Sequence, residues 1–142
     1  MPVARAQQPA SDDRRRAVGR GHGVVMLLEA ATFGVAAVLH LDARFSLVFV
    51  TVRGERVGQA AVGELIVAGV LVVGAIVVLA RPADARRLAC VVTGFAIFGV
   101  IVGLLTIALG VGPRTIPDLV YQVAIMTVLL ISFAVLMNRR RG

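Results

Sequence analysis

Four long apolar runs decide what this chain can fold into. They cover residues 23–41, 60–80, 88–110 and 119–137, and Glu29 and Glu64 are the only Asp, Glu, Lys or Arg inside them. A helix needs about 20 mostly apolar residues to cross roughly 30 Å of hydrocarbon. The strands of a membrane barrel would show alternating segments of about ten residues, whereas these runs are continuous. The sequence therefore predicts an all-α fold, an integral membrane bundle of four transmembrane helices within residues 23–137.

The composition excludes several other classes of protein. The chain is 58% hydrophobic, above the 45–50% of a typical soluble domain, and only 16% of its residues are charged. A single Cys excludes a disulfide scaffold. The net charge of +7 would suit nucleic acid, but the apolar runs leave no soluble domain to carry a basic face. The lipid bilayer, and no nucleic acid, is the expected partner.

The arginines predict the orientation of the helices. Eleven of the fifteen basic residues, all arginine, lie in residues 1–22, 81–87 and 138–142, and four lie in the other two connections. By the positive-inside rule, both termini are cytoplasmic. We expect a multi-pass protein of the bacterial inner membrane, with a disordered basic tail at 1–22 and a basic end at 138–142. The first run is longer than the core of a signal peptide, so cleavage is not expected.

Turn and cap residues agree with these boundaries. Pro82 interrupts the chain after the second run, and Asp84 is expected to cap the third helix. Thr115 and Asp118 have the spacing of a capping box before the fourth helix. Because the connections between the last three spans are short, these spans are predicted to be antiparallel neighbours.

The connection at 42–59 is apolar. The run from Phe45 to Val52, followed by Gly54, predicts a short extracytoplasmic strand with a glycine turn after it. An interfacial or re-entrant helix is the alternative. Such a loop can be a lid over the outer end of the bundle, or an edge that docks a partner's strand.

Ionisable groups within a span cost about 2.5–3.5 kcal/mol each on insertion scales, so each one is a functional hypothesis. Glu29 lies near the cytoplasmic end of the first span and is expected to form an ion pair with arginines there. Helices of alternating direction bring a second set of polar residues to one depth in the outer leaflet. This candidate polar cluster consists of His40, Glu64, Thr106, Tyr121 and Gln122.

The cluster has two interpretations. Glu64 is either a structural carboxyl, hydrogen-bonded to Tyr121, Gln122 or His40, or a group that binds a proton or substrate in an outward cavity. His40 is either a satisfied interfacial histidine or a ligand. Glu29 lies eleven residues before His40, about 16 Å along a helix, so the two cannot form one site.

Other chemistries lack the residues they need. Zinc requires several Cys or His ligands, and the chain has one Cys and two His. A bis-His haem would need His40 from two chains, because His22 lies at the opposite end. Cys90 has no redox partner, and no phosphate loop or Ser-His-Asp set is present. We expect no metal, no cofactor and no enzyme activity.

Small residues predict close helix packing. Gly99 and Gly103 share a face of the third span, and Ala61 and Ala68 lie on the Glu64 side of the second. Stripes of this kind let membrane helices approach each other.

The segment from Gly63 to Gly74 (GELIVAGVLVVG) resembles the second helix of DoxX-like proteins, which are small bacterial four-helix membrane proteins. The resemblance implies a partner of a membrane redox enzyme. The sequence thus leaves three roles. The first is a non-enzymatic accessory subunit or homo-oligomeric scaffold, alone or in a larger membrane complex. The second is a small transporter or proton-coupled carrier that uses Glu64 and His40, and the third is the DoxX-like role.

Overall fold

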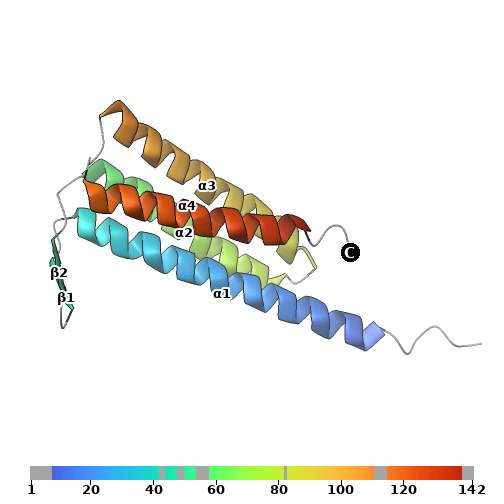
Figure 1. The fold of residues 1–142 in the computed structure, drawn as a ribbon. Helices are drawn as coiled ribbons and strands as arrows, with labels where there is room; N and C mark the ends of the chain where they lie inside the picture. The colour runs from blue at the N-terminus through green and yellow to red at the C-terminus, as the bar shows by residue number, and fades with distance from the viewer. Residues whose placement is uncertain are drawn as a thin grey trace, which may run out of the picture.

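Four helices and a two-stranded hairpin make up the described part of the chain (Figure 1). The computed structural model describes residues 8–41, 44–47, 50–53, 58–81, 83–110 and 115–138. In chain order the elements are α1 (Gln8–His40), β1 (Arg44–Leu47), β2 (Val50–Arg53), α2 (Gly58–Ala80), α3 (Ala85–Leu109) and α4 (Ile116–Asn138).

The helices lie lengthwise beside one another and alternate in direction (Figure 1). We call one end of the bundle the hairpin end, because α1 ends and α2 begins there beside the two strands. We call the other the termini end. There α4 ends, and α1 extends beyond the other three helices (Figure 1).

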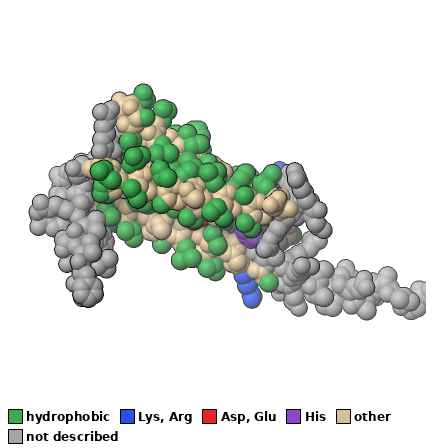
Figure 2. Space-filling view, viewed as in Figure 1, with side chains coloured by type: hydrophobic (Ala, Val, Ile, Leu, Met, Phe, Trp, Pro, Cys, Tyr) green, Lys and Arg blue, Asp and Glu red, His purple; other side chains and the backbone are tan. Residues whose placement is uncertain are grey.

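Each helix is long and apolar enough to cross a membrane. The candidate spans are Gly19–His40, Gly58–Ala80, Ala85–Leu109 and Ile116–Asn138. With 22 to 25 residues they are about 33–38 Å long. Large apolar side chains are exposed on the outside of the helices, among them Phe98 (63%) and Ile116 (79%). Figure 2 shows hydrophobic side chains along the whole visible flank. Hydrocarbon is the solvent that suits such a surface, and the predicted four-helix transmembrane bundle is confirmed.

Alanines contribute many of the buried core residues, beside larger side chains such as Leu71 and Leu129. α2 packs between α1 and α3, and α4 packs against α3. Ala61 and Ala75 of α2 and Ala89 and Ala96 of α3 are fully buried, and Ala68 packs against the same core. These contacts bring the helices close together in the way the alanine stripe predicts.

The two glycines of α3 face different helices. A β-carbon added at Gly99 would lie 2.6 Å from Val67 Cγ2 of α2. One added at Gly103 would lie 3.2 Å from Gln122 Nε2 of α4. The glycine face of α3 therefore serves two contacts, one with each neighbour.

The first helix is longer than the sequence predicted. α1 begins at Gln8, so residues 8–22, which the sequence analysis expected in a disordered tail, lie within this helix. Alanine and arginine favour helix in this segment, and packing holds its second half. At Gly19 an added β-carbon would lie 3.5 Å from Ala85 Cβ, so α1 still touches the start of α3 there. Residues 1–7 and 139–142 lie outside the described residues.

The apolar connection forms strands, as predicted, but the hairpin lies elsewhere in it. β1 pairs with β2 in antiparallel register, from Arg44 opposite Arg53 to Leu47 opposite Val50. The connection between the two paired strands thus falls within the apolar run, while Gly54, where the sequence predicted a turn, lies outside the described residues. Two residues connect the strands, the commonest length of a tight hairpin.

The caps are partly as predicted. Asp118 N donates to Thr115 Oγ1 over 3.3 Å, which is the Thr115 half of the predicted capping box at α4, and the Thr115 hydroxyl in turn donates to the Asp118 carboxylate. Asp84 occupies the cap position of α3 but makes no side-chain hydrogen bond to it. Its backbone carbonyl accepts from Leu88 N instead. α3 ends at Gly110, whose φ of 77° is a left-handed conformation that favours glycine.

Candidate functional site

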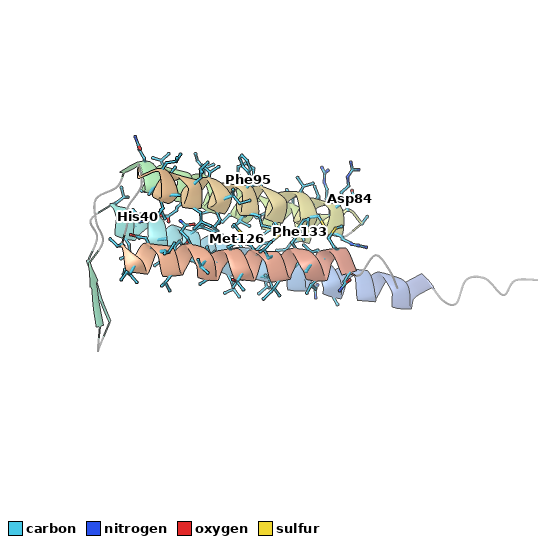
Figure 3. All side chains as sticks on the ribbon, turned by 45° about the horizontal axis from the view of Figure 1, so that its top comes forward. His40, Asp84, Phe95, Met126 and Phe133 are labelled. Carbon is cyan, nitrogen blue, oxygen red and sulfur yellow. The ribbon has the colours of Figure 1, made fainter. Side chains whose placement is uncertain are left out.

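His40, the last residue of α1, joins the carboxylates of two other helices. Its Nδ1 lies 2.8 Å from Glu64 Oε2 of α2, and its Nε2 lies 3.1 Å from Asp118 Oδ1 of α4. His40 and Glu64 are each only 6% exposed. Figure 3 shows His40 at the hairpin end and Asp84 near the opposite end. We call Glu64, His40 and Asp118 the triad.

The triad has a place for one proton more than a neutral imidazole and two ionised carboxylates supply. Each of the two contacts between nitrogen and oxygen needs a hydrogen between its atoms. A neutral imidazole has one N–H, and ionised carboxylates have no donor. An added proton, on the ring or on one carboxyl, would supply the second hydrogen and would leave the three side chains together with a single net negative charge.

A cavity of about 390 Å³ adjoins the triad. We call it the His40 cavity; all four helices contribute to its wall, and all three triad side chains line it. Its other lining residues include Phe33, Phe95, Phe98, Thr106 and Gln122. Its size is within the usual range for small-molecule sites, and a mostly apolar wall with a few convergent polar groups is typical of them.

Two buried oxygens on the wall of the His40 cavity have no hydrogen-bond partner within the described residues. They are Oε1 of Glu64 and Oε1 of Gln122. Buried polar atoms are nearly always hydrogen-bonded, so each such atom calls for an explanation. Both are acceptors, so a water molecule or a ligand with an N–H or O–H group would satisfy them.

The structure brings together most of the predicted polar cluster. His40, Glu64, Thr106 and Gln122 line one cavity. The Thr106 hydroxyl donates to the Gly103 carbonyl over 2.7 Å. Tyr121 is not among the lining residues.

Tyr121 lies beside the cavity instead. Its ring meets Phe33 of α1 edge to face, with centroids 6.3 Å apart and planes at 82°. Its hydroxyl is buried and has no hydrogen-bond partner in the described part of the chain.

Asp118 is the triad member that the sequence prediction left out of its cluster. The Thr115-x-x-Asp118 spacing explains Asp118 as a capping residue, and one of its carboxylate oxygens does accept from the Thr115 hydroxyl at the start of α4. The other oxygen is directed to His40. Its predicted depth could have indicated this contact, since Asp118 lies just before the fourth span at the depth of His40.

Glu29 is buried at the other end of α1 and has a partner that the sequence did not predict. Its Oε1 accepts from Ser132 Oγ of α4 over 2.8 Å. None of the arginines whose side chains the structure describes forms an ion pair with Glu29, so the expected ion pair with arginines stays a prediction. Glu29 and Ser132 line a second cavity, of about 510 Å³, which we call the Glu29 cavity.

The His, Cys, Asp and Glu side chains of the described ranges form no group of three or more that could hold a metal ion. At His40 both ring nitrogens already face carboxylates. Cys90 is a single half-buried thiol near the start of α3.

No family model, curated protein or solved structure matches this chain. The resemblance of residues 63–74 to DoxX-like proteins therefore stays a prediction.

Proposed function

We propose that this membrane protein is a proton-coupled carrier for small organic cations, which bind in the His40 cavity. The observation that carries the proposal is the pair of unpartnered acceptors, Glu64 Oε1 and Gln122 Oε1, on the wall of that cavity. The arginine distribution supports placing both termini in the cytoplasm of a bacterium, with the His40 cavity toward the outer side of the inner membrane.

The chemistry of the cavity favours a cation that has N–H donors and an apolar body. Two acceptor oxygens match the N–H groups of an amine or guanidine, and the negative charge of the triad matches its positive charge. Phe33, Phe95 and Phe98 offer apolar contact and aromatic faces, which attract cations.

The triad supplies the coupling to protons. A cation bound at Glu64 Oε1 lies close to the extra proton of the triad, because the other oxygen of the same carboxylate contacts His40. The two positive charges therefore repel each other. Each therefore weakens binding of the other by the same factor, because linkage between two binding sites is reciprocal. Such competition drives exchange of a cation for a proton.

An accessory subunit or scaffold is the competing proposal. Polar contacts between helices hold membrane proteins together, and the His40 contacts with α2 and α4 fit that role. The His40 contacts would hold the helices together equally well if there were no cavity beside them. A scaffold role therefore does not explain why Glu64 Oε1 and Gln122 Oε1 lie unpartnered on the wall of the His40 cavity.

Calorimetric titration of the purified protein with benzylguanidine tests the proposal. Benzylguanidine carries a guanidinium, which stays protonated near neutral pH, and a phenyl ring. We expect binding, with proton release seen as a dependence of the heat on buffer ionisation. Glu64→Gln keeps the shape of the side chain but removes its charge. It should weaken binding about tenfold or more, because a hydrogen bond to a charged group contributes about 1.5–3 kcal/mol.

Thr127→Ala is the matched control, because Thr127 is exposed on α4 and its hydroxyl donates only to its own helix, at the Val123 carbonyl. In proteoliposomes, added benzylguanidine should make the lumen more alkaline with the wild type and with Thr127→Ala, but not with Glu64→Gln. If neutral benzylurea binds as well as benzylguanidine, or if both variants behave alike, the carrier proposal is wrong and the scaffold role gains.

A further inference from the structure

We infer that the Glu29 cavity is a second binding site for the same class of organic cation, at the termini end of the bundle. This inference rests on the proposed function for the class of ligand. Its own evidence is a buried carboxylate and a cavity that play no part in the His40 site.

One of the two carboxyl oxygens of Glu29 lacks a hydrogen-bond partner within the described residues. The residue is 3% exposed, on the side of α1 that faces α4. Ser132 satisfies its Oε1, while its Oε2 is buried and has no hydrogen-bond partner among the described residues. An ionised carboxylate accepts about four hydrogen bonds, and a buried charge without partners is costly. A ligand with N–H groups and a positive charge would satisfy both needs.

The cavity beside Glu29 is large enough for such a ligand. Its volume is about 510 Å³, and α1, α3 and α4 line it. Besides Glu29, the polar side chains on its wall are His22, Thr93 and Ser132, and the other lining residues are Ala, Gly, Val, Met, Ile and Leu. The lining residues that matter here are His22, Met26, Glu29, Thr93, Ser132 and Val135. One carboxylate in an apolar wall selects a cation with an apolar body, as in the His40 cavity.

An aromatic contact lies between the two cavities. Glu29 and His40 are about 16 Å apart along α1, and Phe33 lies between them and lines the His40 cavity. Tyr121 of α4 meets Phe33 edge to face, with ring centroids 6.3 Å apart. On α4, Tyr121 lies between Asp118 and Ser132. The two sites thus lie one after the other along α1 and α4, and the rings of Phe33 and Tyr121 lie between them.

Fluorine NMR of the full-length protein in detergent tests for the second site. The probe is 4-(trifluoromethyl)benzylguanidine, with Thr127→Ala as the variant control. We expect two bound resonances in the wild type and in Thr127→Ala. Glu29→Gln should remove one of them and Glu64→Gln the other. The neutral urea analogue of the probe should give neither.

The outcomes separate this inference from the proposed function. If the only bound resonance is the one lost in Glu64→Gln, the Glu29 site is refuted and the His40 site stands. If it is the one lost in Glu29→Gln, the Glu29 site stands and the His40 site falls.

A measurement on the wild type covers a failure of Glu29→Gln to fold. Met26 lines the Glu29 cavity and is 2% exposed. With methyl-labelled methionine, a nuclear Overhauser effect should connect the trifluoromethyl group to the Met26 methyl. If a bound probe shows no such effect, the Glu29 site is refuted.

Discussion

Gly94 and Gly99 lie on the same helix, α3, but the space beside them differs, so replacing each by alanine tests how the bundle packs. A β-carbon added at Gly94 meets nothing within 4 Å, whereas one added at Gly99 lies 2.6 Å from Val67 Cγ2. Carbon atoms are in favourable contact at about 3.5–4.0 Å, so the new methyl is about 1 Å too close.

The expected effects have opposite signs. Alanine is better than glycine in a helix by about 0.8–1.0 kcal/mol, and both variants gain this. Overpacking costs about 1–3 kcal/mol and applies only to Gly99→Ala. Val67 cannot move aside easily, because it is buried and its branched side chain is restricted at χ1. Gly94→Ala should therefore be more stable than Gly99→Ala by about 1–3 kcal/mol.

The assay is reversible unfolding in mixed micelles by increasing dodecyl sulfate, followed by circular dichroism. Val67→Ala removes the atom that clashes, so it should reduce the cost of Gly99→Ala when the two are combined, with a coupling energy of about 1 kcal/mol or more. Equal stability of Gly94→Ala and Gly99→Ala, or strict additivity with Val67→Ala, would refute the packing described for α2 and α3.

Three further predictions concern orientation, capping and the triad. After replacement of Cys90, a cysteine at Arg53 should react with an impermeant thiol reagent in intact cells and a cysteine at Ala83 should not; labelling at Ala83 would reverse the proposed orientation. Thr115→Val should lower the free energy of unfolding by about 1 kcal/mol, since it removes the side-chain cap of α4, and an unchanged unfolding curve would exclude that contribution. Glu64→Leu should destabilise the protein more than Glu64→Gln, because it leaves the His40 ring without its partner; the same unfolding assay would contradict this if the order were reversed.

Much of the fold follows from sequence because hydrocarbon admits few alternatives. The four spans are visible as apolar runs, and only helices satisfy their backbone in lipid without a closed barrel. The meeting of His40 with Glu64 also follows from sequence, since consecutive antiparallel helices bring the end of one to the start of the next. The depth of each residue in the membrane can therefore be predicted well from the sequence.

The rotation of a helix about its axis, which decides which side chains face each other, is predicted poorly from the sequence. The sequence places Glu29 near the arginines in depth, but the rotation of α1 and α4, which brings Ser132 to Glu29, has no signal in the sequence. The contact of Asp118 with His40 was missed for another reason. A capping motif already explained why an Asp stands at this position, and no sequence pattern shows that its second oxygen reaches His40. The length of α1 depends on packing, which a local pattern does not contain.

The order in which the polar partners follow one another along the chain has a consequence for synthesis. His40 and Glu64 are 24 residues apart, so their bond can close as soon as the first two helices have left the ribosome and entered the membrane as a pair. Glu29 and Ser132 are 103 residues apart, so the Glu29 carboxylate waits for the last helix. Until α4 is inserted, Glu64 of the nascent protein already has its His40 partner, whereas Glu29 lacks Ser132 and still faces lipid. Insertion of α4 is then the step that completes the protein, and a chain arrested before it would expose Glu29 to the machinery that removes unfinished membrane proteins.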